Sequence, residues 1–165
     1  MKSKKITLRD LPWIIVVIAA FLGAVYAIGT GIERAKADDT SEIDTLIDTF
    51  QETYSAKDAS GLRALFYADA VVAMDATDGE EQSIVSLDEW IVNTRDYVFE
   101  ENGHISDVLS NREIHVFRNI GYAVCDYNYQ SDKKTAQGVD VLTFCKKRGT
   151  WKIVSLQWTG DEFTK

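Results

Sequence analysis

The stretch IDTLIDTFQETYSAKDASGLRALFYADAVVAMD, residues Ile43–Asp75, decides the fold because it specifies two helices and a strand in immediate succession. From Ile43 to Tyr54, apolar residues recur at i, i+3, i+4, i+7 and i+11, which predicts a long helix with one apolar face. Asp58 follows a break in this pattern and can cap a second, shorter helix. The run Ala70–Met74 is apolar at every position, which predicts a strand that is buried on both faces and ends at Asp75.

The residues after this stretch predict a further helix and a set of hairpins. Ser86 and Glu89 form a capping box, which marks the start of the helix. Runs of alternating apolar and polar residues then follow at short separations, which is typical of antiparallel strands joined by hairpins. These runs are Ser106–Arg118, Ile120–Gln130, Gly138–Lys147 and Thr150–Trp158.

Two segments carry a resemblance to a known superfamily. YSAKDASGLRALFYADAVVAMDATDG, starting at Tyr54, resembles the opening of the nuclear transport factor 2-like superfamily, and Gly149–Thr159 resembles its last strand. That superfamily includes SnoaL-like polyketide cyclases and ketosteroid isomerases. The resemblance implies an α+β fold over residues 38–165, in which a curved antiparallel sheet wraps as a cone around N-terminal helices and encloses a pocket.

Residues 1–37 predict delivery to a membrane. A basic segment, Met1–Asp10, precedes Leu11–Ile32, which runs for 22 residues without a charge. At about 1.5 Å per residue, one hydrophobic N-terminal helix of this length crosses the roughly 30 Å of hydrocarbon in a bilayer. Since the basic end stays in the cytoplasm, we expect the domain to lie in the periplasm or outside the cell. Ala35-Lys36-Ala37 fits a cleavage site, so the segment is either an uncleaved signal anchor or a signal peptide removed after Ala37, which would leave the domain secreted.

The charge of the chain argues against one class of partner. The formal net charge is −8, and without residues 1–37 the chain keeps 12 basic and 24 acidic residues, a net charge of −12. Such a domain repels a phosphate backbone, so we expect no binding of nucleic acid.

The resemblance also suggests a catalytic residue. In ketosteroid isomerases the strand after the two helices ends in an aspartate that acts as general base, and Asp75 matches it with a shift of about one residue. The oxyanion-stabilising tyrosine of those enzymes falls at Phe50, which cannot donate a hydrogen bond. Tyr54 lies one turn further along the helix and is the alternative donor. The electrophilic half of that mechanism is therefore absent from its usual position.

A pocket is predicted among aromatic and polar side chains. By period two, Ser155 and Gln157 share a face of the last strand with Trp151. Relatives often carry histidines at these two positions, whereas serine and glutamine can hydrogen-bond a ligand but cannot relay protons. The aromatic residues either fill an ordinary core or contact an apolar ligand. The candidate pocket residues are Phe50, Tyr54, Trp90, Tyr127, Ser155 and Gln157.

Cys125 and Cys145 are candidates for a disulfide. If the hairpin turns near Lys134–Thr135, the two cysteines oppose each other on neighbouring strands, and an exported domain permits oxidation. The alternative is two reduced cysteines that fill core space. His104 and His115 have no second metal ligand at useful spacing, and no glycine-rich phosphate loop is present, so we expect no metal and no cofactor.

These observations favour an exported or membrane-anchored module that binds a small apolar ligand, forms a homodimer through its outer sheet face and does no catalysis. Two alternatives stay open. One is a lyase, isomerase or cyclase that uses Asp75 as general base. The other is a scaffold component of a cell-envelope complex, held in the membrane by Leu11–Ile32.

Overall fold

The computed structural model describes residues 36–74, 83–100 and 103–164. The chain separates into two compact units, Met1–Asp38 and Asp39–Lys165, and the fold below is that of the second unit. The predicted membrane segment, Leu11–Ile32, lies outside the described residues, as does Asp75. Within the described ranges, no helix combines the length and the apolar character that a membrane crossing requires.

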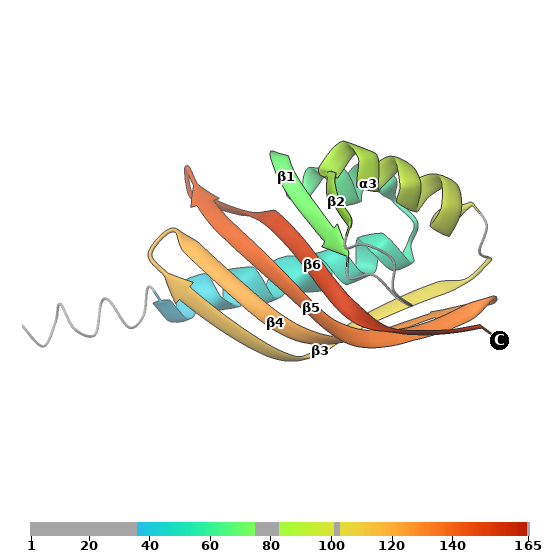
Figure 1. Cartoon of the computed structure of the whole chain (residues 1–165). Coiled ribbons are helices and arrows are strands. Elements are labelled where there is room, and N and C mark those ends of the chain that lie inside the picture. Colours follow the sequence, from blue (N-terminus) through green and yellow to red (C-terminus); the bar gives the residue numbers. More distant parts are fainter. Residues whose placement is uncertain (1–35, 75–82, 101–102, 165) are drawn as a thin grey trace, which may run out of the picture. The chain divides into compact units, whose positions relative to one another are not determined.

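The first helix, residues 36–55, lies along one face of the sheet (Figure 1), and its predicted apolar face is buried. Ile43 and Ile47 are completely buried, and Phe50 is nearly so. Arg112 reaches from the sheet to the exposed flank of the helix, where its Nη1 lies 2.7 Å from a carboxylate oxygen of Asp44 and 2.7 Å from one of Asp48. The buried apolar face and the two ion pairs of Arg112 together hold the helix against the sheet.

Both predicted helix caps are present. The Asp58 side chain accepts a hydrogen bond from the Gly61 N–H at the start of α2 (Ala59–Ala64). The Ser86 hydroxyl accepts one from the Glu89 N–H at the start of α3 (Leu87–Asn93). α3 then continues as a π-helical segment, η1 (Thr94–Phe99).

Six strands form one curved sheet in the order β2-β1-β6-β5-β4-β3 (Figure 1). Their bounds are β1 (Phe66–Met74), β2 (Ser83–Ser86), β3 (Ile105–Phe117), β4 (Ile120–Ser131), β5 (Lys134–Lys147) and β6 (Thr150–Thr164). The mixed α+β architecture is confirmed. The expectation of an entirely antiparallel sheet is wrong at one place, because β1 pairs with β6 in parallel. No hairpin joins these two strands, so their relative direction is not constrained by a short turn.

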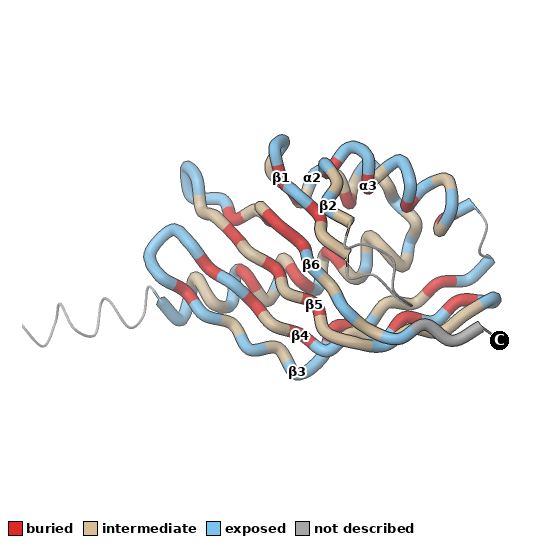
Figure 2. Tube along the Cα trace, viewed as in Figure 1, coloured by how far each residue is buried: buried red, intermediate tan, exposed pale blue. Residues whose placement is uncertain are grey.

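Burial alternates along the strands, and the buried side faces the helices (Figure 2). On β1, Ala70 and Val72 are buried but Val71 is 47% exposed. The prediction that this strand is buried on both faces is therefore wrong, since the helices cover only one face of the sheet. The opposite, outer face carries exposed apolar side chains of β3 and β4.

A β-bulge in β6 changes which residues face the helices. Thr143 of β5 pairs with Ser155, but the next residue, Phe144, pairs with Ile153, so Val154 is an extra residue. Before the bulge Trp151 and Ile153 point inward, and after it Leu156 and Trp158 do. The simple period of two fails at this point.

Candidate functional site

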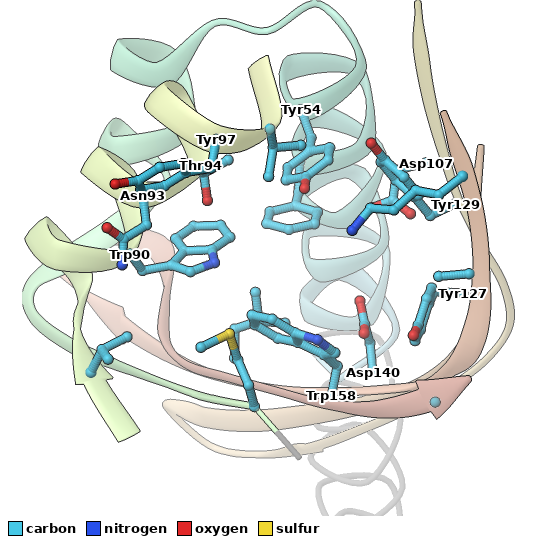
Figure 3. Close-up of a pocket in the computed structure, with 18 of the residues that line it drawn as sticks. Tyr54, Trp90, Asn93, Thr94, Tyr97, Asp107, Tyr127, Tyr129, Asp140 and Trp158 are labelled. Atoms are coloured by element: carbon cyan, nitrogen blue, oxygen red, sulfur yellow. The ribbon is translucent and has the colours of Figure 1, made fainter. Parts of the chain in front are cut away.

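A cavity of about 480 Å³ lies between the first helix, the helical segment α3–η1 and the concave face of the sheet (Figure 3). This volume is in the usual range for a small-molecule site. Its described lining residues are Phe50, Tyr54, Met74, Val85, Trp90, Asn93, Thr94, Tyr97, Val98, Asp107, Tyr127, Tyr129, Lys134, Ala136, Asp140, Leu156, Trp158, Gly160 and Asp161.

Aromatic rings form much of the wall. Trp90 from α3 and Trp158 from β6 lie with their ring centroids 6.4 Å apart. Tyr54 from the first helix meets the ring of Tyr129 edge-on at 6.5 Å. Figure 3 shows these rings on different sides of one space, with Trp158 below it and Tyr54 above it. A flat ligand would contact aromatic surface from several elements.

A fifth ring, that of Tyr127, depends on a pair of glycines. Gly138 of β5 and Gly160 of β6 face each other in the sheet, and Tyr127 of β4 is the register partner of Gly138. A Cβ atom on Gly160 would lie 2.5 Å from the Tyr127 hydroxyl oxygen and would also collide with the Gln137 carbonyl oxygen. The glycines leave room for the tyrosine beside the cavity.

Two carboxyl groups share this aromatic space. Asp107 enters from β3 and Asp140 from β5, on either side of the β4 tyrosines (Figure 3). Asp140 is 6% exposed, and no residue in the described part of the chain donates a hydrogen bond to its carboxylate. The Asp107 backbone is held by a hydrogen bond from its N–H to the Ser55 hydroxyl. The cavity thus combines apolar walls with two convergent acids.

Burial governs the electrostatics of the cavity. It raises the pKa of the Asp107 carboxyl to about 7. Burial, and then the negative charge of Asp107, raise the pKa of Asp140 well above its ordinary value. Burial and then the charge of Asp107 also raise the pKa of the Tyr54 hydroxyl. Near neutral pH Asp107 can therefore serve as a proton donor or acceptor, and Asp140 holds its proton more readily than an ordinary carboxyl does.

Four of the six predicted pocket residues line the cavity, namely Phe50, Tyr54, Trp90 and Tyr127. The prediction for Ser155 and Gln157 is wrong in side-chain direction. Ser155 pairs with the outward Thr143 and shares a 2.6 Å hydroxyl contact with it, and Gln157 is exposed. The bulge at Val154 turns both away from the helices.

The predicted disulfide is also wrong, because the hairpin register differs. β4 and β5 turn at residues 132–133, so Cys125 pairs with Asp140 and Cys145 with Ile120. Cys125 faces the core, whereas Cys145 shares the outer face with the exposed Ile120. Both cysteines are free thiols. Burial and then the charge of Asp140 raise the pKa of Cys125 to about 11, so its thiol stays protonated at neutral pH.

The other candidates are Asp75 and the two histidines. Asp75, the candidate base, lies outside the described residues. His115 stacks on Tyr122 on the outer face, with ring centroids 4.8 Å apart. No cluster of potential metal ligands occurs among the described residues.

Asp107 and Asp140 were missed, although the sequence contained a signal for them. In β5, Asp140 lies an even number of residues from Leu142 and Phe144, which are fully buried, so it shares their face of the strand. In β3, Asp107 shares a face with Ile105 and Leu109 for the same reason. A charged residue on the apolar face of a strand is an exception that indicates either a partner or a function.

The model of a family described as "Putative lumazine-binding" matches residues 38–159. The chain belongs to this lumazine-binding-like family. The fold is shared with solved nuclear transport factor 2-like proteins, so the predicted resemblance is confirmed at the level of the fold.

Solved structures agree with the fold of this lumazine-binding-like domain. A protein from Kribbella flavida is 12% identical, with a TM-score of 0.67 over 78% of this chain and 95% of that one. A nuclear transport factor 2-like protein of unknown function from Pseudomonas putida is 14% identical, with a TM-score of 0.64 over 74% of this chain and 87% of that one.

A third similar structure is an enzyme. A hexachlorocyclohexane dehydrochlorinase from Novosphingobium barchaimii is 12% identical, with a TM-score of 0.65 over 81% of this chain and 92% of that one. At these identities the likeness concerns the fold alone. No curated protein matches the sequence.

Proposed function

We propose that the domain binds a small, flat organic molecule in the cavity between Trp90, Trp158 and the tyrosines. The observation that carries this proposal is that two acids, the buried Asp140 and the half-buried Asp107, line one aromatic space. The name of the lumazine-binding-like family supports a ligand of heteroaromatic type.

The two acids destabilise the folded state when the cavity is empty. Keeping Asp107 charged in the folded state, with a pKa of about 7 instead of 3.8, costs about 4 kcal/mol well above neutral pH. If these positions served only the structure, leucine or asparagine there would give a more stable folded state. A bound molecule that pairs with the acids recovers part of this cost.

Native mass spectrometry of the full-length chain tests the proposal. Ala136 lines the cavity, so Ala136→Trp should fill part of it, whereas Ala68→Trp adds the same ring at an exposed position of β1. We expect a co-purified small molecule, or added lumazine, to appear as a mass adduct on the native chain and on Ala68→Trp but not on Ala136→Trp. Adducts that survive Ala136→Trp unchanged, or no adduct on any form, would contradict the proposal.

The pKa of Asp107 favours a second candidate function, acid–base catalysis in the same cavity. A carboxyl with a pKa of about 7 suits proton abstraction at neutral pH, and one similar fold is a dehydrochlorinase. Chloride release from hexachlorocyclohexane, compared between the native chain and Asp107→Asn, tests this candidate. Equal rates from the two proteins would rule out Asp107 as the base.

The proposal extends to the location of the domain in the cell. A binding domain attached to Leu11–Ile32 would be held at a membrane with its cavity outside the cytoplasm, or released after cleavage at Ala37. An envelope scaffold remains an alternative role for the same anchored domain. The intact mass of the protein isolated from its native membranes distinguishes the full chain from one that begins at Asp38.

A further inference from the structure

The charged groups around the cavity indicate which class of ligand it binds. Asp140 is 6% exposed and lines the cavity. Where the chain is described, it meets no hydrogen-bond donor and no ion-pair partner. Asp107, the acid that acts on Asp140 electrostatically, enters the cavity from the other side of β4. Two acids thus converge on a space that supplies them with little compensating charge.

The ionisable groups around the two acids are mostly acids as well. Tyr54 comes from the first helix, Tyr97 from η1, Cys125, Tyr127 and Tyr129 from β4, Lys134 from β5 and Asp161 from β6. Lys134 is the single base among the described lining residues, and its Nζ lies 5.9 Å above the ring of Tyr129. Burial raises the pKa of Asp107 to about 7 even with this lysine at the cavity.

We propose that the ligand of this cavity is a cation, an aromatic or heteroaromatic molecule whose protonated amino or amidino group lies between Asp107 and Asp140. This inference rests on the proposed binding function. It names the ligand class that the two acids select.

Three features of the cavity fit a cation. An ammonium or amidinium group donates hydrogen bonds, and both carboxylates can accept them. The ring faces of Trp158, Tyr127 and Tyr129 attract positive charge, as the position of Lys134 over Tyr129 illustrates. An anion would meet Asp107, Asp140 and Asp161 together, so the cavity disfavours it.

Binding of the cation should release a proton. At neutral pH Asp107 retains part of its proton because its pKa is about 7, and the pKa of Asp140 is raised as well. A cation favours the ionised carboxylates, so a carboxyl O–H bond breaks and its proton passes to the solvent as the cation binds. Affinity for the cation should therefore fall as the pH falls below about 7.

The test compares matched pairs of small molecules on the full-length chain. Tryptamine, phenethylamine and naphthylethylamine are each paired with the alcohol of the same skeleton, and binding is measured by calorimetry at about pH 8.5 and about pH 5.5. We expect the amines to bind at least about tenfold more tightly than the alcohols at the higher pH, and to lose this advantage at the lower pH. Two buffers of different ionisation enthalpy report the released proton.

Substitutions of the two acids test whether they cause the preference for amines. Asp140→Asn and Asp107→Asn should each remove most of the preference for amines, and Asp69→Asn, at an exposed position on β1, should keep it. Asparagine mimics the protonated acid, so these variants are expected to fold. Alcohols that bind as tightly as the amines would overturn this inference while supporting the cavity as a binding site. No binding by any member of the set would overturn both.

Discussion

At the scale of single residues, Asp107 links the cavity to the stability of the fold. Its folded-state pKa of about 7 lies above the ordinary value of 3.8, so the folded chain holds a proton that the unfolded chain has lost between these pH values. The native protein should therefore become less stable as the pH rises from about 4 to about 7. The cost is then constant at higher pH.

The variant Asp107→Asn should reverse this cost. We expect it to raise the free energy of unfolding at pH 8 by up to about 4 kcal/mol, and to change it little at pH 4. Urea denaturation at the two pH values measures the effect. Asp69→Asn serves as the control, and an Asp107→Asn variant that is less stable than the native chain at pH 8 would contradict the raised pKa.

Arg112 offers a second prediction at this scale. Its side chain is 16% exposed and bridges Asp44 and Asp48 of the first helix. Arg112→Met should leave these two carboxylates uncompensated and remove a hydrogen bond to the Leu109 carbonyl oxygen. We expect a loss of about 1–3 kcal/mol in thermal or urea unfolding.

The matched control for Arg112 is Arg95. Arg95 pairs with Asp96 at the surface, where its side chain is 54% exposed, so Arg95→Met should cost less than about 0.5 kcal/mol. Equal effects of the two substitutions would show that the ion pairs of Arg112 with the first helix contribute no more to stability than a surface ion pair does.

The residues of the candidate site were only partly predictable from the sequence. Aromatic residues on helix faces, such as Phe50, Tyr54 and Trp90, follow from local periodicity because a helix keeps its phase. Asp107 and Asp140 were not selected, because a strand pattern does not say which charged residue on an apolar face is buried beside another. Their convergence depends on β3 and β5 flanking β4, which is a property of the whole sheet.

At the scale of secondary-structure elements, the existence and order of the strands could be predicted, but their register could not. The hairpin between β4 and β5 turns at residues 132–133, a shift that separates Cys125 from Cys145. A polar turn can close at several positions with similar local energy. Core packing across the whole strand selects among them.

The paired glycines of β5 and β6 give a prediction for these elements. Gly160→Ala would place a Cβ atom against the backbone carbonyl of Gln137, which is fixed within the sheet, and 2.5 Å from the Tyr127 hydroxyl oxygen. We expect a loss of about 1–3 kcal/mol in stability and weaker ligand binding, because Tyr127 must move.

A glycine at a turn provides the comparison. Gly149 has a φ of +84° and nothing lies within 4 Å of a Cβ built on it, so Gly149→Asn should cost at most about 1 kcal/mol. Differential scanning calorimetry measures both variants. A Gly160→Ala protein as stable as the native chain would mean that β5 and β6 separate there at little cost.

At the scale of the whole molecule, the outer sheet face supports the proposed homodimer. Phe117, Ile120 and Tyr122 of β3 and β4 are exposed apolar residues, with exposed fractions of 63%, 62% and 37%. The rings of Phe117 and Tyr122 stack on each other at 6.4 Å. A contiguous apolar patch of this kind favours association with another surface.

Sedimentation of the full-length chain tests the dimer. We expect the native chain to sediment as a dimer and the double variant Phe117→Ser, Tyr122→Ser to sediment as a monomer. Ile84→Ser removes a comparably exposed apolar side chain from β2, where Ile84 is 70% exposed, and should leave the dimer intact. A native monomer at concentrations of about 100 μM would contradict the proposal.

The extra residue in β6 has an evolutionary consequence. Deleting one codon at Val154 would restore strict alternation and keep Leu156 and Trp158 at the cavity, because Ser155 already pairs with Thr143 directly after the bulge. The sheet thus absorbs one inserted residue without changing which side chains reach the cavity. Relatives aligned column by column, without regard to this insertion, would be assigned the wrong ligand contacts along the second half of the strand.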